Sequence, residues 1–404
     1  MTLSFSLPLR LPFLFLFHFS NFNNKMVCPF FLTIIAYTAI AYFVKRILTS
    51  IYNIVFPYLY AVPQNLQVLA GAKWAVITGG TDGIGKAYAN ELAKKQFNII
   101  IISRTQSKLD DVAKEIKEEF KEIEVRTIAF DFTNPELEDY DRQIFAQIAD
   151  VDIGVLVNNV GMSYEFPERF ERVHGGIRRV ADMTLINTFP TTILSHHILQ
   201  QMAKRNRGVV VNVASSAANF DWFYLAVYSA TKKYVTSLSS ILRKEYADTN
   251  IYIQTVCPMM VATKMAKIRR SSFFTPSPEK FAIEAVRSIG LTDETTGCLA
   301  HQIQAEIIVA HHGARHVWMD GMLWRIWEKH GSCGNPQMCS AWWLVVLCMA
   351  ARSSTWWLSS LLAHPGEAAQ LMARWGPLER GGSVDSCAQH GWTMEEYGTR
   401  CGFF

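Results

Sequence analysis

Short apolar runs alternate with amphipathic stretches from Lys73 onward, and this alternation predicts parallel strands joined by helices. Apolar residues at helical spacing, with charged residues on the opposite face, predict helices at Lys86–Gln96, Lys108–Phe120 and Tyr228–Ala247. The pattern indicates an α/β fold: a single doubly wound parallel-sheet Rossmann domain over about residues 70–308. The expected strands are Trp74–Thr78, Asn98–Ser103, Glu124–Ala129, Ile153–Asn158, Gly208–Ala214 and Ile251–Cys257.

The first 62 residues lack this alternation and carry very little charge. Val27–Phe43 contains no charged residue, and Lys45 and Arg46 follow it closely. An uncharged run of about 17 residues is at the short end of what spans a bilayer, and basic residues after it favour a cytosolic domain. We therefore expect residues 1–62 to be a hydrophobic extension and membrane anchor. A cleaved signal peptide is the alternative, and Met1 and Met26 are both candidate starts.

Residues 309–404 form an atypical C-terminal tail that is rich in Trp, Gly, Cys and His and has poor periodicity. Ala341–Ala363 is apolar apart from Arg352 and a few hydroxyl residues. A second membrane-associated segment and a disordered tail are the two interpretations of this part.

Composition narrows the function classes. The net charge of +4 is small and dispersed, which argues against a nucleic-acid partner. The eight cysteines include no Cys-x-x-Cys pair and no Cys/His metal spacing, so we expect no metal.

A glycine-rich turn follows the first expected strand and opens a helix at Lys86. In that context glycines let backbone N–H groups and the helix N-terminus approach a pyrophosphate, which predicts dinucleotide binding. The residues expected to hold the cofactor there are Thr78, Gly79, Gly80, Thr81, Asp82, Gly83, Ile84 and Gly85.

The second expected strand ends at Ser103 and is followed by Arg104, with Lys108 nearby and no acidic residue at the strand end. An acidic residue there would bind the ribose hydroxyls of NAD, whereas arginine accommodates a 2′-phosphate. NADP(H) is therefore the expected cofactor.

Tyr228 precedes Lys232 by four residues on an expected helix, which places both side chains on one face. A nearby cation favours the ionised phenol, so the pair could form a tuned proton donor. With the turn motif Thr-Gly-x-x-x-Gly-Ile-Gly, the run Asn158-Asn159-Val160-Gly161, and Ser215 thirteen residues before Tyr228, the chain resembles the short-chain dehydrogenase/reductase family.

Further motifs resemble one branch of that family. They are Pro-x-x-Val-Ala-Thr at 258–263, Thr-Asp-Gly-Ile-Gly-Lys at 81–86 and Ile-Ser-Arg-Thr at 102–105. The branch comprises membrane-bound 17β-hydroxysteroid dehydrogenase type 12 and type 3 proteins, very-long-chain 3-oxoacyl-CoA reductases and nematode steroid-dehydrogenase-like proteins. The resemblance covers about residues 50–308 and not the tail.

The resemblance implies roles for single residues. Tyr228 would be the general acid, Lys232 would lower its pKa and hold the nicotinamide ribose, and Ser215 would donate a hydrogen bond to the substrate carbonyl. Asn187 would support a water relay to Lys232. Asp131 would lie near the adenine, with a turn or cap role as its alternative. Asn158 and Gly161 would help position the cofactor and brace the sheet. The remaining cofactor contacts would come from Pro258, Val261 and Thr263, of which Thr263 would face the nicotinamide carboxamide.

The loop Lys264–Ser277 combines four cations with apolar residues and would suit an acyl-CoA or an anionic membrane surface. With the branch resemblance, this favours NADPH-dependent reduction of 3-oxoacyl-CoA to 3-hydroxyacyl-CoA in fatty-acid elongation, at the endoplasmic reticulum membrane with the domain facing the cytosol. A 17β-hydroxysteroid dehydrogenase is the alternative enzyme, and a non-catalytic membrane-tethered NADP(H)-binding scaffold is the alternative of another class. The expected partners are a lipid-like ketone, a membrane and a second copy in a homodimer.

Overall fold

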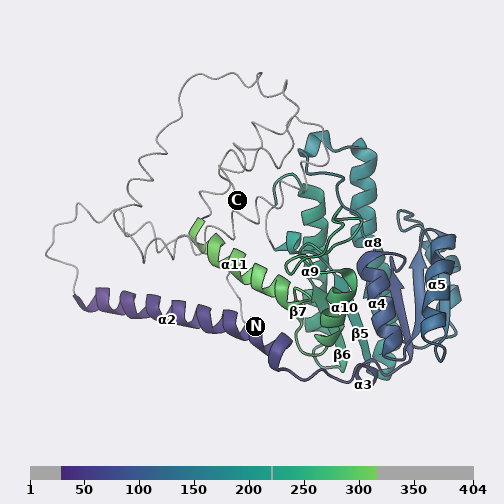
Figure 1. Cartoon of the computed structure of the whole chain (residues 1–404), viewed down its shortest axis with the longest axis horizontal. Helices are drawn as coiled ribbons and strands as arrows, with labels where there is room; N and C mark the ends of the chain where they lie inside the picture. Colours follow the sequence, from purple (N-terminus) through teal and green to yellow (C-terminus); the bar gives the residue numbers. More distant parts are fainter. Residues whose placement is uncertain (1–28, 220–221, 316–404) are drawn as a thin grey trace. The chain divides into compact units, whose positions relative to one another are not determined.

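The computed structural model describes residues 29–219 and 222–315, and its strands form one parallel sheet (Figure 1). The strand order in the described residues is β3-β2-β1-β4-β5-β6-β7. The six predicted strands are confirmed to within a residue at each end. Their bounds are β1 Trp74–Thr78, β2 Asn98–Ser103, β3 Val125–Ala129, β4 Ile153–Asn158, β5 Gly208–Val213 and β6 Ile251–Val256. A further strand, β7 (Glu294–Thr295), was not predicted, because two residues give no alternation to detect.

The chain runs outward from β1 to β3 and then returns to place β4 on the other side of β1. Trp74 of β1 pairs with Asn98 of β2 and with Ile153 of β4. In such a sheet the loops diverge where the order reverses and leave a crevice at the carboxyl ends of the strands. The end of β1 at Thr78 and the end of β4 at Asn158 therefore mark the expected site.

Helices cover both faces of the sheet, as a doubly wound fold requires. Ala75 and Ile77 of β1 pack with α4 (Gly83–Lys94), α5 (Gln106–Glu119) and α10 (Pro278–Arg287). Val76 faces the opposite way, toward α8 (Gly176–Arg205) and η3 (Asp141–Phe145), with the end of α9 (Ala226–Glu245) beside them. Burial of both faces explains why β1 is apolar up to its last residue, Thr78. The remaining elements are α2 Pro29–Val55, η2 Phe56–Tyr60, α3 Leu66–Ala70, α6 Leu137–Tyr140, α7 Ala146–Ile148, η4 Phe170–Arg172, η5 Ser216–Ala218 and α11 Leu299–Arg315.

The predicted helices are confirmed, but each begins two or three residues earlier than expected. The start of α4 has a local cause, because Asp82 accepts a hydrogen bond from the Gly83 N–H at 2.8 Å and caps the helix there. The glycine-rich turn therefore contains the first turn of α4.

The N-terminal part differs from its prediction. Along the described residues no helix combines the length and apolar character needed to cross a membrane, so the anchor expected at Val27–Phe43 is not confirmed. The helix does not end at Phe43 but continues past the cations to Val55. Arg46, Ser50 and Asn53 of α2 contact Glu306 of α11 at 3.4, 2.7 and 3.0 Å.

The expected end of the domain at residue 308 falls inside α11, which continues to Arg315. The segments Met1–Lys25 and Ala341–Ala363, whose roles were interpreted from composition, lie outside the described residues.

Candidate active site

The crevice begins with Thr78, whose side chain is fully buried at the end of β1. Its Oγ1 accepts hydrogen bonds from the backbone N–H groups of Asn159 at 2.9 Å and Val160 at 3.0 Å. The side-chain amide of Asn159 in turn donates to the backbone carbonyl of Thr78 at 2.9 Å. Thr78, predicted as a cofactor contact, therefore acts by fixing the loop after β4 against the loop after β1. Asn159 was missed as a site residue, although the Asn-Asn-Val-Gly motif contains it.

The glycine-rich turn packs so closely against its neighbours that side chains there would collide with them or lie in tight contact. Gly79 and Gly83 have φ of +66° and +53°, which disfavours any residue with a Cβ. A Cβ on Gly80 would lie 2.6 Å from Ile101, and one on Gly85 would collide with Asn159 and the Gly79 carbonyl. The N–H groups of a first helical turn have no partner within the helix, so the start of α4 after this tight turn fits a bound pyrophosphate. Ile84 packs its side chain against the core, and its predicted contact with the cofactor stays a prediction.

A cleft of about 390 Å³ continues from this turn past the end of β2. The Thr81 and Ser103 hydroxyls lie 3.0 Å apart on its wall. Arg104 and Lys108 bring positive charge to the same cleft, and Arg104 lies 4.0 Å from the Asp131 carboxylate. This cationic end fits the 2′-phosphate of NADP(H). Five residues that the sequence analysis predicted as cofactor contacts line the cleft: Thr81, Arg104, Lys108, Asp131 and Gly161.

Asp131 has the turn role that its alternative interpretation gave. Its Oδ1 accepts hydrogen bonds from the Thr133 N–H at 3.0 Å and the Thr133 hydroxyl at 2.9 Å. The remaining carboxylate oxygen faces Arg104. Contact with an adenine ring stays a prediction.

The segment after β6 reaches across to the glycine-rich turn. Lys264 forms a 2.8 Å ion pair with Asp82. Burial alone would raise the pKa of Asp82, but the hydrogen bonds from Lys264 and from the Gly83 N–H lower it overall. Thr263 lies against Gly83, where an added Cβ would be 3.1 Å from the Thr263 methyl carbon. Lys264, which the sequence suggested only as a substrate-loop cation, thus ties the segment after β6 to the glycine-rich turn.

The start of the same segment lies under the catalytic residues. The Pro258 carbonyl accepts a hydrogen bond from the Ser216 N–H at 2.9 Å, next to Ser215. Val261 is 3% exposed, and its side chain belongs to the core. Its contact with the cofactor stays a prediction. His301 of α11 supports this segment: its Nδ1 accepts from the Met259 N–H at 3.3 Å, and its Nε2 lies 3.1 Å from the Met260 carbonyl.

Three predicted catalytic residues converge at one side of α9. Lys232 is 4% exposed, and its Nζ donates to the Val213 carbonyl at 3.0 Å. The same Nζ lies 5.9 Å from the centre of the Tyr228 ring. Ser215 precedes η5, and its Oγ accepts from the Ala217 N–H at 3.2 Å.

The pKa values correct one expectation. Burial raises the pKa of Tyr228, and its hydrogen bond with Ser215 opposes that rise. Burial also lowers the pKa of Lys232 to about 8. The net lowering of the Tyr228 pKa that was expected from Lys232 is therefore not found, because removal of the phenolate from water is the largest effect on this pKa. Tyr228 is held as a neutral hydroxyl near neutral pH.

Asn187 of α8 links the loop after β4 to α9. Its side-chain oxygen accepts from the Met162 N–H at 2.8 Å, and its amide group donates to the Met162 carbonyl at 2.9 Å and to Thr231 at 3.0 Å. A Cβ on Gly161 would lie 3.0 Å from the Asn187 oxygen and 3.3 Å from Lys232 Nζ. Gly161, Asn187 and Lys232 are thus brought together as predicted. The water relay stays a prediction.

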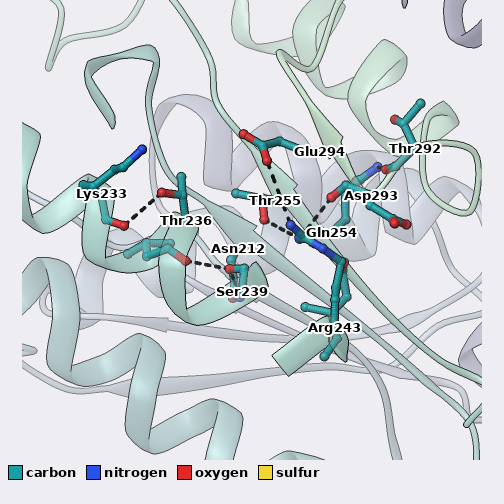
Figure 2. A network of polar contacts seen from close by, with 12 residues as sticks. Asn212, Lys233, Thr236, Ser239, Arg243, Gln254, Thr255, Thr292, Asp293 and Glu294 are labelled. Atoms are coloured by element: carbon teal, nitrogen blue, oxygen red, sulfur yellow. Dashed lines mark hydrogen bonds and ion pairs between the residues drawn. The ribbon is translucent and has the colours of Figure 1, made fainter. Parts of the chain in front are cut away.

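Polar contacts hold α9 over β5 and β6 (Figure 2). Asn212 of β5 donates to Ser239 at 2.8 Å, and Arg243 donates to the Thr255 hydroxyl at 2.7 Å. Asn158 extends this network across the sheet, because its amide donates to Asn212 at 2.8 Å. With 3% of its surface exposed, Asn158 confirms the predicted brace of the sheet and does not face the cleft.

Along the described residues there is no group of three or more acidic, histidine or cysteine side chains that could hold a metal.

Comparisons with known proteins agree with this geometry. Residues 73–272 match the family described as short chain dehydrogenase. The very-long-chain 3-oxoacyl-CoA reductase let-767 of Caenorhabditis elegans is 53% identical over 283 residues, which are 70% of this chain and 89% of that protein. The protein named "Putative steroid dehydrogenase 2" of the same organism is 46% identical over 283 residues, which are 70% of this chain and 90% of that protein. A solved 7β-hydroxysteroid dehydrogenase structure has a TM-score of 0.54 at 21% identity and covers 63% of this chain and 96% of its own, which supports the fold.

Proposed function

The chain belongs to the short-chain dehydrogenase/reductase family, and we propose that it is an NADPH-dependent reductase that converts 3-oxoacyl-CoA to 3-hydroxyacyl-CoA. The observation that carries this proposal is the convergence of Ser215, Tyr228 and Lys232 beside the cleft that ends at Arg104 and Lys108. The 53% identity with a relative named as this reductase supports the substrate class.

The residues present fit the cofactor. The turn at 79–85 would hold the pyrophosphate, since its positive-φ glycines bring the backbone N–H groups at the start of α4 to the crevice. Arg104 and Lys108 would hold the 2′-phosphate. When bound, NADPH supplies the hydride for the ketone carbon.

The chain's own residues handle the oxygen and the proton. The Ser215 hydroxyl donates a hydrogen bond to the substrate carbonyl and stabilises negative charge as it develops on the oxygen. Tyr228 transfers its hydroxyl proton to the same oxygen, and its raised pKa means that this proton is present near neutral pH. Lys232, whose pKa is about 8, stays largely protonated at pH 7 and stabilises the phenolate that the transfer leaves.

The loop after β6 supports a long acyl-CoA over a compact steroid. Met265, Phe273 and Phe274 are exposed apolar side chains that suit a fatty chain. Lys264 and Lys267 line the cleft and suit the phosphates of coenzyme A. A steroid would use the apolar part and leave Lys267 without a role, while Lys264 would keep its ion pair with Asp82.

Turnover by purified protein with NADPH tests the proposal. A long-chain 3-oxoacyl-CoA and a 17-ketosteroid are compared at equal concentration, with consumption of NADPH as the measurement. We expect turnover of the acyl-CoA to exceed that of the steroid. Steroid turnover alone would favour the steroid dehydrogenase, which the relative named "Putative steroid dehydrogenase 2" supports. NADPH binding with no turnover of any ketone in a broad panel would favour the non-catalytic scaffold.

We further propose that the protein resides at the endoplasmic reticulum membrane with this domain in the cytosol. The support is the row of exposed apolar side chains along α2, which leave a large apolar surface uncovered in the described residues. Protease protection and alkaline extraction of microsomes test this: we expect a membrane-retained protein whose domain is digested from the cytosolic side. The exposed apolar side chains of α2 that form this row include Tyr37, Ile40, Ile47, Leu48, Ile51 and Tyr52.

A homodimer is proposed from the family resemblance alone. Sedimentation equilibrium in detergent tests it, with a mass of two chains expected.

A further inference from the structure

The helix that carries the proton donor begins without a cap of its own. The N-cap residue of α9 is Leu225, whose side chain accepts no hydrogen bond. The N–H groups of a first helical turn have no partner within the helix and need an acceptor from elsewhere. At α9 that acceptor is Tyr164, whose hydroxyl oxygen takes the Val227 N–H at 3.1 Å. Val227 directly precedes Tyr228.

Tyr164 is held firmly enough to act as a fixed cap. Its side chain is 8% exposed and clusters with Val173, Met183 and Val227, and Tyr228 packs against this cluster. Burial raises the pKa of Tyr164, while the Val227 N–H opposes the rise. The hydroxyl is therefore neutral at physiological pH, with a lone pair available to the helix.

The backbone on either side of Tyr164 is fixed by other elements. Arg179 of α8 donates to the Ser163 carbonyl at 2.7 Å. Farther along the loop, the Glu168 N–H donates to the Tyr224 carbonyl at 3.1 Å, which joins the loop after β4 to the segment before α9. Tyr164 is thus tied through one loop to Gly161, on the cofactor side of the site.

We propose that Tyr164 is a positioning residue that caps α9 and thereby sets where the Tyr228 hydroxyl lies relative to the cofactor loop. The inference rests on the proposed carbonyl reduction, since it concerns the geometry of that proton transfer. A buried N–H without a partner disfavours the local helical conformation, so loss of the cap loosens the first turn of α9. The ring of Tyr164 and its packing are a separate contribution, which the test must preserve.

The test is Tyr164→Phe, which removes the acceptor and keeps the ring. Its matched control is Tyr234→Phe on the same helix, where the lost hydroxyl bonds to Thr192 at 2.8 Å and caps nothing. We expect Tyr164→Phe to lower kcat about tenfold, with KM for the ketone and Kd for NADPH within about twofold of wild type, since only an interaction that orients the proton donor is lost. Tyr234→Phe should match wild type in all three.

Amide hydrogen exchange is measured on the same full-length proteins without substrate. We expect the Val227 amide to lose protection in Tyr164→Phe while Val235, farther along α9, keeps it. Unchanged protection at Val227 would overturn the proposal, whatever ketone the enzyme reduces. A rise in KM with kcat preserved would also overturn it, because Tyr164 also lines the cleft and would then be a substrate contact. Since exchange needs no turnover, failure of the cap is distinguishable from failure of the proposed reaction.

Discussion

Replacing Thr78 by Val tests how the two halves of the crevice are joined. The change keeps the shape of the side chain and its preference for strands, but it removes the Oγ1 that accepts from the Asn159 and Val160 N–H groups. Each buried N–H left without a partner costs about 1–3 kcal/mol, so the expected loss in the free energy of unfolding is about 2–6 kcal/mol. The upper part of that range is a large share of a domain's stability of about 5–15 kcal/mol.

Urea unfolding of Thr78→Val is compared with Thr127→Val, a threonine-to-valine change on β3 at a partly exposed position. With a urea slope of about 2–3 kcal/mol/M, the midpoint of Thr78→Val should fall by about 1 M or more, and that of Thr127→Val by much less. Affinity for NADPH should fall as well, because the loop carrying Gly161 is no longer fixed to β1. Equal midpoints for the two variants would refute the assignment of these two N–H groups to Thr78.

Three further results are expected. Tyr228→Phe should lower kcat by about 10²-fold or more with the Kd for NADPH nearly unchanged, because it removes the transferred proton and little binding surface; stopped-flow turnover and fluorescence titration check this. Arg104→Ala should weaken NADPH binding about tenfold and leave NADH binding unaffected, which calorimetry of both cofactors measures. His301 has its pKa lowered to about 4 by burial, so the unfolded chain binds a proton there between pH about 6.5 and 4 and the folded chain does not. Wild-type stability should therefore fall as pH drops through that window, and His301→Gln should show a shallower fall in urea midpoints at matched pH values.

The sheet could be predicted closely because its strands are buried on both faces. Runs such as Trp74–Thr78 and Ile153–Asn158 contain no polar residue before their last position, which is a local signal. The strand β7 gives no such signal, because its two residues join the sheet only through pairing with β6. The apolar run that ends at Phe43 does not give the length of α2, which continues to Val55, because a charge pair that ends an apolar run does not end a helix.

The site was predictable as far as it depends on residue type and spacing. Ser215, Tyr228 and Lys232 carry their chemistry in the sequence, and the structure brings them together. Which residues form hydrogen bonds with one another could not be predicted, because these bonds join segments that are distant in the sequence. Nothing near Tyr164 in the sequence indicates that it caps a helix beginning at Ala226. The raised pKa of Tyr228 was unpredictable for the same reason, since it comes from burial and not from the neighbouring lysine.

The loop after β4 contacts both the glycine-rich turn and α9, so in the proposed mechanism it sets how the proton donor lies relative to the cofactor. At its start, Asn159 is bonded to Thr78 beside the phosphate-binding turn. Beyond it, Met162 is bonded to Asn187, which also reaches α9 at Thr231. The loop then meets α9 a second time, where Tyr164 accepts the Val227 N–H. Because one short loop makes all these contacts, a shift of the loop moves the proton donor and the cofactor contacts together. Variants in this loop should therefore change kcat even where their side chains touch neither the substrate nor the cofactor.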